Sequence, residues 1–343
     1  MNKAKVAVVV LNWNGKVHLE RFLSSVVENT PEYARLFVAD NASTDDSVAF
    51  LACNFPQVKI LHLGANYGFA GGYNRALRQV DADYFVLLNS DVEVTPGWIG
   101  PVVEFMESHP GVVAAQPKIL SFAEKEKFEY AGAAGGFMDV LGFPFCRGRI
   151  LHYLEADLGQ YNNETQILWA TGACLFVRAD AFWEADGFDE QFFAHMEEID
   201  LCLRLHRMEY KVVSVPSTKV YHLGGGTLSS TSPRKTFLNF RNSLWVMAKN
   251  WPGKYFYPLI PLRLALDVVA AFVFIARGNF RGAWAVFQAH WEFAKKWVFM
   301  RRLAPSFSQK LPEGVLMGSI VLNFYLNRIK RFSQLKKFRQ NYT

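Results

Sequence analysis

The chain has 343 residues, which is enough for one large domain or for a domain with a sizeable extension. Hydrophobic residues make up 51% of it, which excludes a disordered chain, and the net charge of +6 is too modest to indicate nucleic acid as a partner. Four scattered cysteines without a Cys-x-x-Cys pair argue against a zinc site and favour free thiols in a reducing compartment.

The first apolar run, residues 6–11, follows two lysines as a signal peptide would. However, it is short, and Asn12, Asn14 and Gly15 come next instead of a small-residue cleavage site. We interpret the run as the first buried strand and expect a cytoplasmic protein. Strand and helix patterns then alternate to about residue 120, which predicts an α/β fold with a mainly parallel, Rossmann-like sheet and helices on both faces.

The expected elements of this first part follow in chain order. They are a helix over 17–27, a strand at 36–39, a helix opened by residues 44–46, a strand at 58–63, a glycine-rich loop at 64–72, a helix over 73–80, a strand at 84–88, a helix capped by Thr95-Pro96, and a strand at 112–119. Residues 121–164 break the alternation and are too aromatic for a linker, so we expect an ordered excursion over the active face.

Regular patterns return after this excursion. They predict a strand at 172–178, helices near 179–185 and over 197–208, short strands at 211–215 and 218–221, and a loop at 222–227. Asp200 and Arg204 are spaced to pair along the second of these helices.

Residues 84–88 form a short apolar run without polar alternation, which is typical of a strand buried on both faces. It stops at Asn89, Ser90 and Asp91, and ligands bind at the carboxyl ends of such strands. Asp91, with Glu93 two residues on, therefore suits a divalent cation and a phosphate-bearing substrate. An ordinary turn leading to the next helix explains the same residues equally well.

Seven motifs together extend over residues 5–250: VVVLNWNG (8–15), VADNASTDDS (38–47), NYGFAGGYNRAL (66–77), LLNSDVEV (87–94), TGACLFVR (171–178), GFDEQFFAHMEEIDLCLR (187–204) and VYHLGGGT (220–227). In this order they resemble the inverting, family 2 type of glycosyltransferase with the GT-A nucleotide-sugar-binding fold. The resemblance is greatest to bacterial rhamnosyltransferase-like enzymes of surface polysaccharide synthesis. It implies a GT-A catalytic domain over 1–250.

The resemblance assigns the nucleotide to the first three motifs. Asp40 matches the aspartate that holds uracil or thymine, which implies a UDP- or dTDP-sugar donor, and Asn12 matches a position near the nucleotide. The alternative for Asp40 is a turn or helix cap. Small and polar residues precede a helix N-terminus, which favours anions; they are Asn66, Gly68, Gly71, Gly72 and Asn74.

Asn89, Ser90 and Asp91 take the place of the family's Asp-x-Asp metal motif, with Asn89 as a departure from it. Asp91 is the expected ligand of Mg²⁺ or Mn²⁺, and His222 matches a family histidine near the diphosphate. An imidazole ligand favours Mn²⁺ slightly. The alternative for a lone histidine is a structural role.

The family carries a Glu-Asp pair whose aspartate is the catalytic base. Here the pair is Glu197 and Glu198, so Glu198 takes the base position, and the helix N-terminus favours its ionised form. The alternative is two helix-capping acids. Trp169, Thr171 and Gly172, together with Glu197, match the acceptor side, although Trp169 suits a buried core equally well. Arg241 matches a position that contacts the diphosphate.

Residues 251–343 read as a helical extension in which basic and aromatic residues alternate. Arg263 and Asp267 interrupt its most apolar part, which argues against a bilayer span. We expect peripheral contact with an anionic membrane, at the cytoplasmic face of the inner membrane, and a lipid-linked or growing glycan as acceptor. The alternative is a helical cap with a solvated basic face. An inactive scaffold and a sugar nucleotidyltransferase are competing functions, and the oligomeric state stays open.

Overall fold

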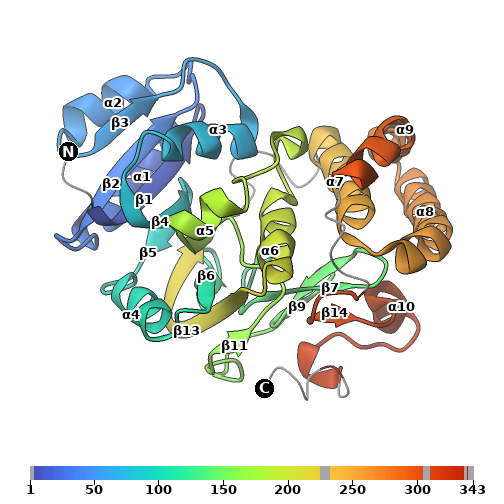
Figure 1. Ribbon diagram of the computed structural model, residues 1–343. Helices are drawn as coiled ribbons and strands as arrows, with labels where there is room; N and C mark the ends of the chain where they lie inside the picture. Colours follow the sequence, from blue (N-terminus) through green and yellow to red (C-terminus); the bar gives the residue numbers. More distant parts are fainter. Residues whose placement is uncertain (1–3, 225–231, 304–309, 336–337, 339–343) are drawn as a thin grey trace.

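The chain folds around a nine-stranded sheet, shown in the computed structural model of Figure 1, which describes residues 4–224, 232–303, 310–335 and 338. The strand order is β11-β13-β6-β12-β4-β1-β2-β3, and β5 pairs with β13. Four parallel strands form one half: β1 (Ala4–Asn12), β2 (Ala34–Asp40), β3 (Lys59–His62) and β4 (Ala82–Asn89).

The other half mixes strand directions. β6 (Val112–Ser121) and β13 (Lys211–His222) are parallel to each other, whereas β12 (Cys174–Arg178) runs antiparallel to both β4 and β6. β5 (Val92–Val94) and β11 (Thr165–Gln166) pair antiparallel with β13. The sheet is therefore mixed but mainly parallel, and the predicted fold class is confirmed.

Helices cover both faces of this sheet because successive side chains of a strand point to opposite faces. Val6, Val8 and Val10 of β1 pack in one core with α1 (Lys16–Glu28), α2 (Ser47–Asn54) and α4 (Gly100–Ser108). Ala7 and Val9 belong to the core on the other face. That face is covered by α3 (Gly68–Leu77), α5 (Ala179–Glu184) and α6 (Glu197–Arg207).

The excursion after residue 121 builds a second, smaller sheet of order β10-β9-β8-β7-β14. Its strands are β7 (Gly136–Asp139), β8 (Pro144–Cys146), β9 (Arg149–Ile150), β10 (Tyr153–Leu154) and, from the C-terminal part, β14 (Val315–Leu316). The buried Asp139 ties this sheet to the later chain, because its carboxylate accepts from the backbone N–H of Ile320 at 2.8 Å. The C-terminal part thus completes a sheet that begins before residue 150.

The C-terminal part is mostly helical: α7 (Pro233–Asn250), α8 (Gly253–Ala276), α9 (Phe280–Arg302) and α10 (Ile320–Tyr325), followed by a short 3-10 turn at Phe332–Gln334. Another 3-10 turn, at Glu190–Phe192, precedes α6. Figure 1 shows α7, α8 and α9 side by side, beyond α6 and away from β2 and β3. By length and composition α8 is able to cross a membrane, and only 17% of its most apolar stretch is buried.

Two expected helix starts are wrong. The helix expected at Thr95-Pro96 begins at Gly100, because Gly97 has a φ of +69° and Thr95 Oγ1 donates to Lys219 O at 2.8 Å. The helix expected from residue 73 begins at Gly68, so the glycines lie inside it. A Cβ at Gly68 would lie 2.6 Å from the backbone oxygen of Phe193, so close packing outweighs the poor helix propensity of glycine here.

Strand limits differ as well. The strand expected at 84–88 extends from Ala82 to Asn89, and β5 after it pairs separately with β13. The two short strands expected at 211–215 and 218–221 form one strand, β13, with an irregular register after Ser214. Of the loop expected at 222–227, residues 225–227 lie outside the described residues. All four cysteines are free thiols.

Candidate active site

The carboxyl ends of the central strands bring the predicted polar residues into one row. In the sheet register Asn12 of β1 lies opposite Asp40 of β2, and Leu11 lies opposite Asn89 of β4. Because β1, β2 and β4 are parallel, all three polar side chains meet at the same sheet edge. Asn12 Nδ2 donates to Ser43 Oγ at 3.1 Å, while its buried Oδ1 has no protein partner.

Asp40 is buried and its carboxylate accepts from the backbone N–H of Ser43, with both oxygens at 3.3 Å. The turn that we gave as the alternative role of Asp40 is therefore present. Binding of a nucleotide base by Asp40 stays a prediction. The neighbouring Asn41, which sequence reasoning passed over, joins this turn to α3. Its Nδ2 donates to Asn66 Oδ1 at 3.2 Å and to Gly68 O at 3.0 Å.

The N-terminus of α3 is already occupied by protein groups. The N–H groups of Phe69 and Ala70 donate to Phe193 O at 2.7 and 3.1 Å, and Gly68 N donates to Asn66 Oδ1 at 2.9 Å. Asn74 holds the backbone of Phe188 through both ends of its amide, at 2.8 and 2.9 Å. In this structure these residues fasten the segment ahead of α6 rather than present free donors to a phosphate.

The second cluster lies across the turn between β4 and β5, which contains Ser90 and Asp91. His222 is paired with Val92 in the sheet register, so its imidazole faces this turn. His222 Nε2 lies 3.2 Å from Asp91 Oδ1 and 3.4 Å from Asn89 Nδ2. Sequence reasoning missed Glu129, whose Oε2 lies 3.2 Å from His222 Nδ1, although not at a hydrogen-bonding angle.

The opposite charges of His222 and its two acidic neighbours stabilise one another. Burial alone would lower the pKa of His222, but Glu129 and Asp91 outweigh it and raise the pKa to about 10. Burial likewise opposes ionisation of Asp91, yet His222 holds the pKa of that carboxyl below its usual value. In the metal-free protein His222 is thus a cation between two carboxylates.

The same residues fit a divalent cation. A carboxylate oxygen and an imidazole nitrogen 3.2 Å apart are able to share one ion, and both atom types suit Mn²⁺. Among the described residues no group of three acidic, histidine or cysteine side chains forms a complete cage, so substrate phosphates and water would supply the remaining ligands. Glu93 lies outside this cluster and pairs with Lys125 at 2.5 Å.

The two glutamates begin α6, where Glu197 is buried and Glu198 is half-buried. Burial and the neighbouring Glu198 raise the pKa of Glu197 well above its usual value, and burial raises the pKa of Glu198 to about 7. The expectation that the helix N-terminus keeps both ionised is wrong, because desolvation outweighs the backbone N–H groups. Glu198 therefore exchanges its proton near neutral pH, as a general base requires, and the pKa of its neighbour Glu197 is shifted in the same direction.

The backbone just before α6 is held in an unusual conformation. Phe193, His195 and Met196 have positive φ angles of 65°, 68° and 72°, which cost about 1–3 kcal/mol each. Asn242 of α7 holds this segment: its buried Nδ2 donates to Phe192 O, Ala194 O and His195 O at 3.0, 2.9 and 2.7 Å. Sequence reasoning did not single out Asn242, although it follows Arg241.

Arg241 supports the same segment. Its Nη2 donates to Gln191 O at 3.3 Å and to Phe192 O at 3.1 Å, and its guanidinium lies 4.0 Å from the centre of the Trp245 ring. In this structure Arg241 therefore holds protein backbone. Contact with a diphosphate stays a prediction.

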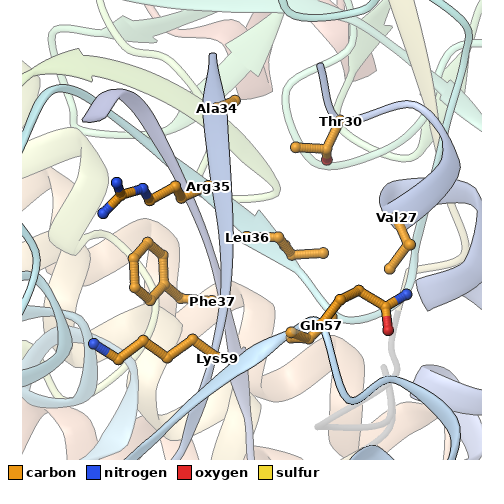
Figure 2. Close-up of a pocket in the computed structure, with 9 residues that line it drawn as sticks. Val27, Thr30, Ala34, Arg35, Leu36, Phe37, Gln57 and Lys59 are labelled. Atoms are coloured by element: carbon orange, nitrogen blue, oxygen red, sulfur yellow. The ribbon is translucent and has the colours of Figure 1, made fainter. Parts of the chain in front are cut away.

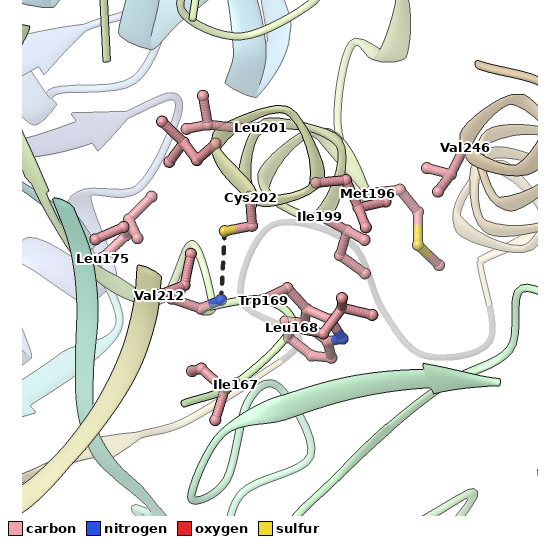
Figure 3. Packing of buried hydrophobic residues seen from close by; sticks show 14 of the residues in the cluster. Ile167, Leu168, Trp169, Leu175, Met196, Ile199, Leu201, Cys202, Val212 and Val246 are labelled. Carbon is pink, nitrogen blue, oxygen red and sulfur yellow. Dashed lines mark hydrogen bonds between the residues drawn. The ribbon is translucent and has the colours of Figure 1, made fainter. Parts of the chain in front are cut away.

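The three acceptor-side residues are buried between α6 and the two sheets. Trp169 is 4% exposed, its Nε1 donates to Phe137 O at 2.8 Å, and Gly136 leaves room for its ring. Figure 3 shows Trp169 among Leu168, Ile199 and Met196 under α6. The backbone N–H of Thr171 donates to Gln116 Oε1 at 3.0 Å, and the ring of Phe69 covers Gly172. Trp169 is thus packed in the core, which is the alternative role given for it above.

A pocket of about 290 Å³ lies elsewhere, as Figure 2 shows. It is lined by the amino half of β2, the start of β3 and the end of α1. This is the sheet edge opposite to Asp40 and Asn89, and its lining holds no acidic or histidine side chain. We therefore assign it no part in the site.

Comparison with known sequences identifies relatives of this chain. The family described as Glycosyl transferase family 2 matches residues 7–186. N-acetylglucosaminyl-diphospho-decaprenol L-rhamnosyltransferase of Mycobacterium tuberculosis is 32% identical over 233 residues, which cover 63% of this chain and 75% of the relative. Rhamnosyltransferase WbbL of Escherichia coli is 22% identical over 230 residues, covering 63% of this chain and 83% of the relative.

Solved structures agree on the fold. The structure of GalNAc-T7 with UDP, GalNAc and Mn²⁺ superposes with a TM-score of 0.57 at 17% identity, covering 74% of this chain and 49% of the other, so the match extends over about half of that protein. Mannosyltransferase PcManGT from Pyrobaculum calidifontis, in complex with GDP-Man and Mn²⁺, superposes with a TM-score of 0.52 at 14% identity, covering 88% and 84%. At these identities the likeness concerns the fold alone.

Proposed function

This chain belongs to glycosyl transferase family 2, and we propose that it is an inverting transferase that moves a sugar from a UDP- or dTDP-sugar to a hydroxyl of a lipid-linked or growing glycan. One observation carries the proposal. The strand ends bring Asn12, Asp40, Asn89 and Asp91 to one sheet edge, and β13 brings His222 to Asp91 at 3.2 Å. An edge with a paired carboxylate and imidazole suits a nucleoside diphosphate with a divalent cation.

Glu198 is the proposed base. It takes the proton from the acceptor hydroxyl as that oxygen attacks the anomeric carbon, while the bond to the nucleoside diphosphate breaks on the opposite side and the configuration inverts. Burial and the charge of Glu198 raise the pKa of Glu197, which disfavours two adjacent charges at this position. A Mn²⁺ or Mg²⁺ ion held by Asp91 and His222 would stabilise negative charge on the departing diphosphate.

Tyr73 of α3 joins this helix to the end of β4. Its hydroxyl donates to Leu88 O at 3.1 Å, one residue before Asn89. Burial raises the pKa of this phenol. We infer that the proposed base and the proposed metal ligands act in one site, since α3 and α6 pack on the same face of the sheet.

The sugar and the acceptor are inferred from the relatives. Two of them are named rhamnosyltransferases, and the more similar one is named for an acceptor in which N-acetylglucosamine is linked through a diphosphate to decaprenol. We infer a rhamnosyl donor and a polyprenyl-diphosphate-linked acceptor in surface polysaccharide synthesis. Such an acceptor would bring the enzyme to the cytoplasmic face of the inner membrane.

The test is a donor screen with purified protein. UDP- and dTDP-sugars, dTDP-L-rhamnose among them, are incubated with Mn²⁺ or Mg²⁺ and a short polyprenyl-diphosphate N-acetylglucosamine, and products are identified by mass spectrometry. We expect one donor to give a glycosylated lipid of inverted configuration, and its rate to fall in the Asp91→Asn and Glu198→Gln variants.

The Glu93→Gln variant is the matched control, because Glu93 follows Asp91 closely but pairs with Lys125 outside the cluster. It should keep the rate of the unaltered enzyme. A protein that binds no nucleotide sugar and transfers none would contradict the proposal and favour a scaffolding role.

A further inference from the structure

The helices α8 and α9 together expose an apolar surface that no other described part of the chain covers. Their large exposed side chains are Tyr257, Leu262, Val269, Phe272, Val273, Ile275, Phe280, Trp284, Phe287, Trp291, Val298 and Phe299. Phe280, Trp284 and Trp291 are each about two-thirds exposed. A surface this apolar is uncommon on a soluble monomer and marks a contact with a partner or a membrane.

These residues follow helical spacing, so they form a continuous face rather than scattered exceptions. On α9, Phe280, Trp284, Phe287 and Trp291 recur at intervals of three or four positions. On α8, Phe272 and Val273 follow Val269 by three and four positions. The small residues Ala271, Ala283 and Val286 pack between the two helices on the inner side. We call the twelve exposed side chains the α8–α9 apolar face.

Positive charge accompanies the apolar face. From the start of α8 to the end of α9 the sequence has eight basic and two acidic side chains, so this segment alone carries as much net charge as the whole chain. Exposed cations lie at the start of α8, at the turn between the helices and along α9, and they are Lys254, Arg277, Arg281, Lys295, Lys296 and Arg302. Of the two acids, Asp267 is buried. The charge is therefore complementary to anionic lipid headgroups.

The charged residues of α8 decide how it meets a membrane. Arg263 and Asp267 point inward and pair at 2.9 Å. Arg263 also donates to Leu141 O at 2.8 Å, beside the small sheet, and to Ser243 Oγ of α7 at 2.6 Å. A bilayer-spanning α8 would have to leave these partners or draw them into hydrocarbon, and both are costly.

Contacts made by α9 with α8 and α7 also hold α8 in this position. His290 of α9 lies 3.4 Å from Asp267, and Arg301 near its end donates to Ala248 O of α7 at 2.9 Å. Since α9 returns alongside α8 to the same part of the molecule, a span by α8 would require α9 to cross as well, with Glu292, Lys295 and Lys296 in the middle of its second half.

We propose that the α8–α9 apolar face lies in the plane of an anionic membrane, with its aromatic side chains at the headgroup boundary and its cations on the lipid phosphates, and that α8 does not span the bilayer. A face with tryptophan and phenylalanine beside lysine and arginine is typical of interfacial helices. The surface stands apart from the donor site, so it holds whichever sugar is transferred, and it would bring the site to a lipid-linked acceptor.

The test is vesicle flotation of the full-length protein. Vesicles of phosphatidylcholine alone are compared with vesicles that also contain phosphatidylglycerol, at low and high salt. We expect binding to the anionic vesicles, weakened by salt, and a loss of about tenfold or more in the double variant Trp284→Glu, Trp291→Glu. The Leu158→Glu variant is the control, because Leu158 is 86% exposed on a loop outside these helices.

Two further measurements distinguish in-plane binding from a loss of folding and from a membrane span. Circular dichroism and thermal unfolding must be unchanged in the double variant, since both tryptophans are exposed, and an alkaline carbonate wash of native membranes must release the wild-type protein. Resistance to that wash would overturn the in-plane arrangement in favour of a span. Absence of binding to anionic vesicles would overturn the proposal, and a wild-type dimer that the double variant dissociates would assign the face to a second copy instead.

Discussion

His222 Nδ1 lies 3.2 Å from Glu129 Oε2, on the side of the imidazole opposite to Asp91. Glu129 comes from the loop after β6, whereas His222 ends β13, and the pairing of these two neighbouring strands brings them together. The carboxylate also accepts from the backbone N–H of Ala131, which fixes its position. Glu129 is therefore placed to orient His222 and to hold its Nε2 toward Asp91.

From this contact we predict that Glu129→Gln weakens metal binding. An outer carboxylate that orients a histidine ligand is typically worth about 10–100-fold in metal affinity. Titration of Mn²⁺ followed by electron paramagnetic resonance, in the presence of UDP or dTDP, measures the effect directly. Glu93→Gln should bind Mn²⁺ like the wild type, and an unchanged affinity in Glu129→Gln would assign the carboxylate a purely structural role.

The rate of transfer should rise with pH through about 7, because burial raises the pKa of Glu198 to about that value and only the carboxylate accepts a proton. Steady-state rates with saturating donor and acceptor, measured from pH 5.5 to pH 8.5, give the profile. Replacing Glu198 by Gln should lower the rate by about 10²–10⁴-fold and remove the rise. A residual rate with an unchanged inflection would assign the base to another residue.

The same two glutamates should affect stability in the opposite direction. Their pKa values in the folded protein lie above those of the unfolded chain, so the stabilisation they give is present below the unfolded pKa and is lost as the pH rises through the folded one. The thermal midpoint should therefore fall between about pH 5 and pH 8. A Glu197→Gln, Glu198→Gln double variant should show a flatter profile over this range.

We predict that Asn242→Ala lowers kcat more than it raises the KM for the donor. Asn242 holds the carbonyl groups of Phe192, Ala194 and His195, which lie just before Glu197 and Glu198. Without it the left-handed segment relaxes and the base moves, and a displacement of about 1 Å costs roughly a hundredfold in rate. Asn54→Ala, which removes an exposed amide on α2, is the matched control. Equal changes in both kinetic constants would contradict a positioning role.

Asp200 follows Glu197 and Glu198 in the first turn of α6. We predict that Asp200→Asn destabilises the protein. Its buried carboxylate contacts Lys249 at 2.8 Å and Arg204 at 2.9 Å and accepts from Asn250 at 2.9 Å. Although burial opposes its charge, the two cations hold the pKa of Asp200 well below its usual value. Removing the charge leaves two cations short of a partner in the interior, at a cost of about 3 kcal/mol.

Urea denaturation measures that loss. The comparison variant is Asp46→Asn, which breaks an exposed pair with Lys16 and should change the free energy of unfolding by less than about 0.5 kcal/mol. If both variants lost the same amount, the network around Asp200 would not be the cause.

Much of the fold followed from local patterns in the chain. Apolar runs bounded by polar residues predicted the parallel strands, and the pairing of Asp200 with Arg204 followed from helical spacing and is confirmed at 2.9 Å. The helix starts at residues 68 and 100 did not follow. At Gly68 a tertiary contact with Phe193 overrides weak helix propensity, and before Gly100 a positive φ at Gly97 delays the helix.

The candidate site divides in the same way. The sequence by itself determined that Asn12, Asp40, Asn89 and Asp91 lie at one sheet edge, because strand ends in a parallel sheet share an edge and polar residues interrupt the apolar runs there. Only the tertiary structure decided that Glu129 faces His222, that burial raises the pKa of Glu197, and that Arg263 and Asp267 turn inward from α8. Each depends on solvent exclusion and on contacts between residues far apart in the chain, and the local sequence determines neither.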